Sequence, residues 1–210
     1  DRGALRVLAV FDKPDPLDGP FFEETIYVTP SRHDTAGITR ALERAVAAIG
    51  LSDGPVHAEF RLHRGEPWPL EIAPRSIGGL CSRALRFVGA GAAPVPGFIP
   101  LESLLLRHAL ELGPLAFARE DRAAGVMMIP IPRAGVLREV VGADEARAVP
   151  AIEEVRIAIA PGAEVVPLPE GMRYLGFIFA RADTPARVES ALREAHARLG
   201  FHIVPAQRTP

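Results

Sequence analysis

The sequence predicts an α+β protein made of two units, each combining helices with antiparallel strands. Short apolar runs of strand character, separated by turn residues, recur along the 210 residues. A few longer segments instead repeat apolar residues at helical spacing. After the first half of the chain, the expected elements are mostly short strands with a single long helix. We therefore expect one domain over residues 1–114 and a smaller α+β domain over residues 123–210.

The first expected strand covers residues 4–11, whose sequence Ala-Leu-Arg-Val-Leu-Ala-Val-Phe is rich in strand formers. Because this run follows Asp1 almost at once, we expect its neighbour in the sheet to lie upstream. A turn-rich stretch leads to a second apolar run at residues 22–28. Residues 35–49 then place apolar side chains at helical spacing, and Gly50 follows, which predicts a helix.

Two further strands, residues 56–62 and 68–73, are expected to form a hairpin around a turn at residues 64–66. A helix at about residues 80–88 and a leucine-rich helix over residues 101–112 complete the first domain. Of these elements, the hairpin carries the side chains with chemical interest.

The second domain is predicted from short strands and one helix. The helix covers residues 184–199, because Thr184 and Pro185 suit the N-cap and the first helical position, and Gly200 suits its end. The strands are expected at residues 125–131, 136–141, 152–158 and 173–180. The simplest account is a small α+β unit with an antiparallel sheet.

Composition excludes several classes of function. With 24 basic and 26 acidic residues the net charge is −2, which offers no field for a polyanion, so nucleic-acid binding is disfavoured. Cys81 is the only cysteine, so no internal disulfide forms and a reducing, cytoplasmic location is favoured. No apolar run approaches the roughly 20 residues of a membrane span, so we expect no membrane partner.

Alternation along the hairpin predicts a polar face with two glutamates. Glu59 lies on that face of the first strand together with His57, because side chains alternate along a strand. In the second strand, Leu70 and Ile72 are expected to face the core, which puts Glu71 on the polar face.

A hairpin that is symmetric about Gly65 pairs Glu59 directly with Glu71. Carboxylates only ~5 Å apart repel each other unless a cation lies between them. Two carboxylates suit Mg²⁺, which keeps several waters and shares oxygens with a substrate phosphate. The alternative is a solvated face on which the two glutamates point apart. Pro67 and Pro69 leave the register open by a residue or more.

An anion site is expected next to the carboxylates. The run Arg75-Ser76-Ile77-Gly78-Gly79 leaves the second strand and enters the helix expected at about Leu80. Backbone N–H groups and a positive helix end then lie beside a guanidinium, which suits a phosphoryl group in transit. A tight entry into a helix is the alternative explanation of the glycine pair.

Two stretches of the sequence resemble a known superfamily. His57-Ala58-Glu59-Phe60, followed by Leu70-Glu71-Ile72-Ala73-Pro74-Arg75 and the glycine pair, resembles the metal-binding hairpin of ATP-grasp proteins, in which an acid precedes Glu-x-Asn-x-Arg. The run Gly125 to Pro130 looks like the small C-terminal domain of the L-amino acid ligase branch. The resemblance implies the C-terminal half of an ATP-grasp catalytic domain over residues 1–114, followed by that small domain over residues 123–210.

The resemblance also implies a carboxylate–amine ligase that forms an acyl phosphate from a carboxylate and ATP and then joins it to an amine, amino acids included. Glu59 and Glu71 would hold Mg²⁺, or Mn²⁺ in its place, against the ATP phosphates. Arg75 would be the catalytic residue that stabilises the transferred phosphoryl group. The substrate carboxylate or acyl phosphate would lie against Ser76, Gly78 and Gly79.

Several residues qualify this assignment. His57 shares the face of Glu59 and is a candidate substrate-binding residue, with a core or surface histidine as the alternative. Cys81 has no histidine at partner spacing, which favours a structural role. Ala73 stands where the family has asparagine, so one metal ligand is missing. Lys13, the only lysine among the 24 basic residues, does not match the nucleotide-binding lysines of the family.

Two functions therefore stay open. In the first, the chain is the C-terminal portion of an ATP- and Mg-dependent ligase and is inactive without the N-terminal part of the same polypeptide. In the second, it is a non-catalytic ligand-binding or interaction module of ATP-grasp ancestry. The expected partners are a small carboxylate, a small amine and that N-terminal part, and a homodimer is left open.

Overall fold

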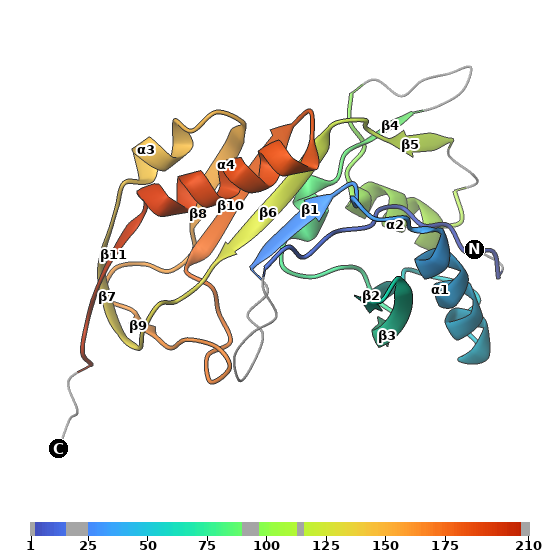
Figure 1. Ribbon diagram of the computed structural model, residues 1–210, viewed down its shortest axis with the longest axis horizontal. Coiled ribbons are helices and arrows are strands. Elements are labelled where there is room, and N and C mark those ends of the chain that lie inside the picture. Colours follow the sequence, from blue (N-terminus) through green and yellow to red (C-terminus); the bar gives the residue numbers. More distant parts are fainter. Residues whose placement is uncertain (1–2, 16–24, 90–96, 113–115, 207–210) are drawn as a thin grey trace. The chain divides into compact units, whose positions relative to one another are not determined.

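The structure is a computed structural model that describes residues 3–15, 25–89, 97–112 and 116–206. The chain divides into two compact units (Figure 1). Unit 1 comprises residues 1–10 and 31–121, and unit 2 comprises residues 11–30 and 122–210. Both contain helices and antiparallel strands, which confirms the predicted α+β class.

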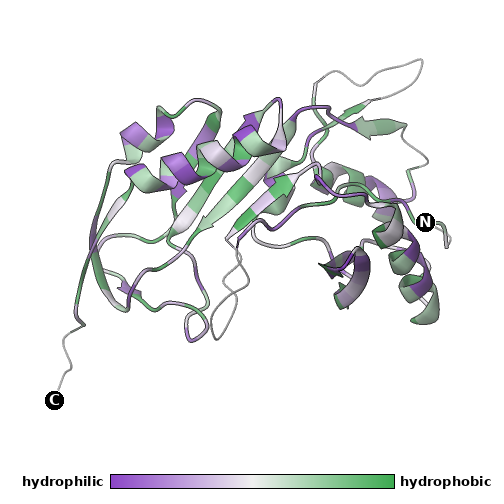
Figure 2. Ribbon diagram, viewed as in Figure 1, coloured by the Kyte–Doolittle hydropathy of each residue, from purple (hydrophilic) through white to green (hydrophobic). Residues whose placement is uncertain are grey.

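Unit 2 is built on a four-stranded antiparallel sheet in the order β1-β6-β10-β8. Helix α4 (Pro185–Arg198) packs against β6 and β10 (Figure 1). Figure 2 shows apolar residues along these strands and hydrophilic residues on α4. The strands are β1 (Ile26–Thr29), β6 (Ala123–Ile129), β8 (Ile152–Ile157) and β10 (Gly176–Ala182).

A second sheet in unit 2 has the order β11-β7-β9. It consists of β7 (Gly135–Val141), β9 (Glu164–Val165) and β11 (Gly200–Val204), and the short helix α3 (Ala143–Arg147) follows β7. The strands predicted near β6, β7, β8 and β10 are confirmed to within a few residues. The sequence analysis did not predict β9, β11 or α3.

The hydrophobic core of unit 2 lies between its sheets and α4. Ile26, Leu137, Ile178 and Leu192 are among its fully buried side chains. Close approach of α4 depends on Gly125 in β6, because a Cβ there would lie 2.8 Å from a methyl carbon of Val188. Burying one such aliphatic side chain contributes about 1.5–3 kcal/mol, so this core accounts for the compactness of the unit.

Unit 1 has smaller elements. Its helices are α1 (Ala36–Ala48), α2 (Leu101–Ala109) and the 3-10 turn η1 (Cys81–Ala84). Its strands form two antiparallel pairs: the hairpin of β2 (His57–His63) with β3 (Glu66–Ala73), and β4 (Phe87–Gly89) with β5 (Phe117–Arg119), which α2 separates in the sequence. The structure confirms the helix predicted over residues 35–49, and α2 covers the first nine residues of the helix predicted over residues 101–112.

Two predicted elements of unit 1 are wrong. Residues 4–11 form no strand, because no segment in the described ranges forms a ladder with them. The helix predicted at residues 80–88 is the single turn η1 followed by β4, since Phe87 pairs with Arg119 and also bridges to Ile99. Long-range pairing has overridden the local helical pattern here.

The second apolar run contributes to unit 2. Only its last residues are described, and Ile26 to Val28 pair with β6 from Met127 to Gly125. Residues 22–24 of the predicted strand lie outside the described residues. None of the helices in the described ranges combines the length and apolar character needed to cross a lipid bilayer.

Candidate active site

The hairpin of β2 and β3 places the two predicted glutamates opposite each other. Glu59 is the Cα partner of Glu71, and the neighbouring pair on the same face is His57 with Ala73. Facing residues in an antiparallel pair have Cβ atoms about 4.5–5.5 Å apart. The predicted pairing of Glu59 with Glu71 across the hairpin is confirmed.

The hairpin is not symmetric about Gly65. Its loop consists of two residues, Arg64 and Gly65, with φ of 53° and 82°, and His63 pairs with Glu66 across it. Continued without interruption, this register would bring Glu59 opposite Leu70. The register shifts between Glu59 and Phe60, and Leu70 is the extra residue of the resulting β-bulge. The bulge is what brings Glu71 opposite Glu59.

The bulge also changes which side chains share the carboxylate face. Trp68 is the partner of Arg61, two residues along from Glu59, and is 58% exposed. Leu70 was predicted to face the core and is instead 56% exposed. Counting alternate residues back from Ile72 would place Trp68 on the face opposite the carboxylates, whereas the bulge places it on the same face as they are. The nearby Pro67 and Pro69 were the available signal for an irregular strand.

Arg75 lies beside Glu71. Its Nη2 donates to Oε1 of Glu71 at 2.8 Å, and its Nη1 donates to the backbone carbonyl of Ser76 at 3.1 Å. Both side chains of the ion pair are about half exposed. The guanidinium is therefore held at the end of β3, beside one of the two facing carboxylates and open to a bound anion.

His57 lies beside Glu59. Its Nε2 is 3.7 Å from Oε1 of Glu59, and both side chains are more enclosed than the Arg75–Glu71 pair. The structure thus brings the predicted residues His57, Glu59, Glu71 and Arg75 together on one hairpin.

The loop after Arg75 differs from the predicted anion site. It leads into η1, a 3-10 turn of four residues, so no long helix supplies a positive end there. Ser76, Gly78 and Gly79 are exposed, and a Cβ built on Gly78 would have no heavy atom within 4 Å. These three residues offer backbone groups in an open loop. Cys81, which begins η1, is 1% exposed, as a structural residue would be.

The donor set at the hairpin can be tested against the metal that the sequence implies. No group of three or more histidine, cysteine, aspartate or glutamate residues in the described part of the chain could enclose a metal ion. Mg²⁺, however, is commonly held by one or two carboxylates while waters and substrate phosphates complete its shell. Glu59 and Glu71 fit that mode of binding, and Ala73 adds no ligand.

Comparison with protein families matches two segments of the chain. Residues 1–84 match the family described as ATP-grasp domain. Residues 127–204 match the family described as L-amino acid ligase C-terminal domain 2. The first segment contains Glu59, Glu71 and Arg75, and the second covers most of unit 2.

Two known proteins, one of them a solved L-amino acid ligase, are similar to most of this chain. The L-amino acid ligase from Bacillus licheniformis superposes with a TM-score of 0.77 at 27% identity, over 98% of this chain and 50% of that one. An uncharacterized protein of Sinorhizobium fredii, y4rH, is 25% identical over 170 residues, which are 78% of this chain and 33% of that protein.

A more distant structure shares the fold. The biotin carboxylase domain of the Hydrogenobacter thermophilus 2-oxoglutarate carboxylase, solved with MgADP and bicarbonate, gives a TM-score of 0.55 at 14% identity, covering 87% of this chain and 40% of that one. The chain thus spans half or less of each of these relatives. The chain therefore joins a segment that matches the ATP-grasp domain to a segment that matches the L-amino acid ligase C-terminal domain, and its fold is similar to half of the solved L-amino acid ligase.

Proposed function

We propose that the chain is the portion of an ATP- and Mg²⁺-dependent carboxylate–amine ligase that contacts the ATP phosphates. Such an enzyme transfers the γ-phosphoryl group of ATP to a substrate carboxylate, and an amine then displaces phosphate from the acyl phosphate to form an amide. The bacterial relative named an L-amino acid ligase supports amino acids as the substrate class. The relative solved with MgADP supports Mg²⁺ with an adenine nucleotide as the ligand.

The observation that carries the proposal is the pairing of Glu59 with Glu71 next to Arg75. When bound, Mg²⁺ neutralises the phosphate oxygens and screens the two carboxylates from each other. Glu59 and Glu71 hold the ion from one face of the hairpin. Arg75, whose Nη2 is 2.8 Å from Oε1 of Glu71, lies where it would stabilise negative charge on the group in transfer.

Two other predicted residues have supporting roles in this proposal. His57, 3.7 Å from Glu59, orients that carboxylate or donates to a phosphate oxygen. The loop of Ser76, Gly78 and Gly79 follows Arg75 directly and offers backbone N–H groups to the substrate carboxylate.

A non-catalytic module of the same ancestry is the second candidate, and Ala73 favours it. Ala73 lies two residues from Glu71 on the same face and contributes no oxygen where the family pattern has asparagine. In this candidate, a site that lacks the asparagine oxygen of the family pattern binds nucleotide without turning it over.

The experiment is phosphate release from ATP by the full-length protein, with Mg²⁺ and pairs of amino acids. Glu59→Gln and Glu71→Gln are expected to reduce turnover at least about 100-fold, because loss of an electrostatic catalytic group costs about 2.7–4 kcal/mol. Glu66→Gln is the matched control, since Glu66 is an exposed glutamate at the turn of the same hairpin. It should retain the activity of the unmodified protein.

The outcomes separate the two candidates. If Glu71→Gln turned over ATP as fast as the unmodified protein, the assigned role of that carboxylate would be contradicted. Full-length protein that binds Mg·ADP but never releases phosphate, with any amino-acid pair, would establish the non-catalytic module instead. Circular dichroism of each variant confirms that the fold is retained.

A further inference from the structure

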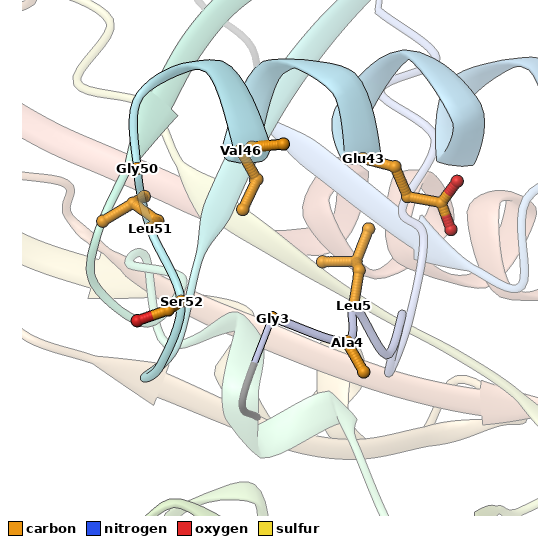
Figure 3. A pocket seen from close by; sticks show the side chains of 9 residues that line it. Gly3, Ala4, Leu5, Glu43, Val46, Gly50, Leu51 and Ser52 are labelled. Carbon is orange, nitrogen blue, oxygen red and sulfur yellow. The ribbon is translucent and has the colours of Figure 1, made fainter.

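Two hollows in the described part of the chain differ in what they could bind. The larger, of about 560 Å³, lies in unit 1 between residues 3–5 and the C-terminal half of α1. Of its lining residues only Glu43 is charged, and Figure 3 shows the Glu43 oxygens at one side of the hollow and the Ser52 oxygen at the other. A single charged group beside an aliphatic wall is too little to select a ligand.

The smaller hollow, of about 180 Å³, lies in unit 2, where the chain runs from β9 to β10 (Figure 1). Its floor belongs to the hydrophobic core, since Ile131, Ile159 and Val165 line it and are no more than 5% exposed. Val166 and Met172 also line it and are 38% and 95% exposed. An aliphatic group bound here would lie on an apolar floor, and the flexible side chain of Met172 could cover it.

Three charged side chains line the same hollow, and they are Glu164, Glu170 and Arg173. All three are exposed. None of these side chains makes a hydrogen bond or an ion pair with another residue in the ranges that the structure describes. Charges of both signs beside the apolar floor are therefore available to a ligand.

Backbone contacts fix the walls of the hollow before any ligand binds. The N–H of Gly171 donates to the carbonyl of Pro167 at 2.7 Å, which closes the loop on itself. A Cβ at Gly171 would collide with the carbonyl of Val166, so this close packing requires glycine. On the other side, Val165 is paired with Gly135 of β7. Because the walls are held in this way, little ordering entropy opposes binding.

We propose that this hollow binds a free aliphatic α-amino acid as a zwitterion. The guanidinium of Arg173 binds the α-carboxylate, and the carboxylates of Glu164 and Glu170 bind the α-ammonium group. The aliphatic side chain of the ligand lies on Ile131 and Val165. A phosphate ester fits less well, because it would meet two carboxylates. The volume of about 180 Å³ is below the roughly 300–1,000 Å³ of sites for drug-sized ligands, which suits a ligand as small as an amino acid.

The proposal goes beyond the ligase function and does not depend on it. All residues that line this hollow belong to unit 2, whereas Glu59, Glu71 and Arg75 belong to unit 1. Binding here is therefore measured without ATP or Mg²⁺, and its failure would leave the proposed ligase function untouched.

The test is a titration of the 210-residue chain with L-leucine, followed by NMR of the isoleucine methyl groups. The signals of Ile131 and Ile159 should shift and saturate, with a dissociation constant on the order of 1 mM, because the hollow holds only one aliphatic side chain and two charged groups. Glycine, which lacks the aliphatic side chain, should bind at least about tenfold more weakly.

Two analogues of leucine test the charged contacts separately. N-acetylleucine lacks the ammonium group, and leucinamide lacks the carboxylate. Each should bind at least about tenfold more weakly than leucine, because each loses a hydrogen bond between charged groups. Equal affinity for leucine and both analogues would overturn the zwitterion as the ligand.

Substitutions in the hollow identify the residues that bind leucine. Arg173→Gln, and Glu164→Gln combined with Glu170→Gln, should each weaken leucine binding at least about tenfold. Arg138→Gln is the matched control and should keep the affinity of the unmodified chain, since Arg138 is an exposed arginine of β7 that does not line the hollow. The remaining methyl signals show that each variant is folded.

Two results would overturn the site. One is the absence of any shift of Ile131 and Ile159 in leucine at about 20 mM, well above the expected dissociation constant. The other is leucine binding that is lost in Arg75→Gln and kept in Arg173→Gln, because leucine would then bind at the candidate active site.

Discussion

Unit 2 closes its hydrophobic core within the described residues, whereas unit 1 does not. The extended core cluster lies wholly in unit 2, and all seven residues of β6 are buried. In unit 1, α1 has no buried residue and neither does the β2–β3 hairpin. The large apolar residues left exposed in unit 1 are Val7, Ile49, Leu62, Trp68, Leu70, Phe98, Leu106, Leu110 and Leu112, against Val141, Val166 and Met172 in unit 2.

The candidate site lies on the unit whose hydrophobic core is less closed. The candidate residues Glu59, Glu71 and Arg75 are all on the unit with the uncovered apolar surface. These exposed apolar side chains are the part of unit 1 that a partner could cover. We expect unit 2 to fold with most of its final stability, and unit 1 to gain stability from a covering partner.

The largest expected difference between the units comes from one substitution made in each. Leu192→Ala removes a fully buried side chain of α4 and should lower the free energy of unfolding by about 2–5 kcal/mol. Leu106→Ala alters a side chain of α2 that is 63% exposed, and it should change the free energy of unfolding by no more than about 0.5 kcal/mol. Urea denaturation followed by circular dichroism measures both.

The fluorescence of Trp68 adds a probe of unit 1, because it is the only tryptophan in the sequence. Equal losses of stability for the two leucine substitutions would show that the units do not differ in core closure.

A smaller effect distinguishes the helix caps. In unit 2, the Thr184 side chain accepts a hydrogen bond from the backbone N–H of Arg187 at 3.3 Å, whereas Thr35 before α1 makes no side-chain cap bond. Thr184→Ala should therefore cost about 1 kcal/mol of stability, and Thr35→Ala close to none. Thermal unfolding of the two variants side by side would expose any reversal of that order.

The smallest expected effect is a pH dependence confined to unit 2. Burial lowers the pKa of His196 from its ordinary 6.5, because desolvation disfavours the imidazolium. Below about pH 6.5 the imidazole of His196 is protonated in the unfolded chain but is still neutral in the folded unit. Stability is thus fully present above that pH and falls as the pH drops toward the folded pKa.

His196→Gln should remove this part of the acid sensitivity, as measured by urea denaturation between pH 5 and pH 8. A variant with the same pH slope as the unmodified chain would assign the sensitivity to other groups.

Sequence patterns predicted the self-contained part of the fold best. The helix around Val188 and Leu192 was predicted from the residues at its two ends, and the main strands of unit 2 from short apolar runs; both signals are local in the sequence. The strand at residues 4–11 and the helix at residues 80–88 failed because pairing partners decide the conformation there. Short elements such as β9 carry too few residues for any period to show.

The candidate site was predicted more fully than its surroundings. Residue types and spacing were enough to bring Glu59, Glu71, His57 and Arg75 onto one hairpin. The position of Trp68 was missed, because alternation cannot reveal a bulge. The expected helix end after Gly79 was wrong because only one 3-10 turn forms there before the chain pairs as β4.

The bulge at Leu70 has a consequence for reading related sequences. Residues from the turn to Phe60 follow one register, and residues from Glu59 onward follow another. A relative that lacked Leu70 would have a regular hairpin in which the same two carboxylates still meet. A gap of one residue between the turn and the second glutamate therefore says nothing against a functional site, and alignments of this hairpin are best anchored on the glutamates instead of the turn.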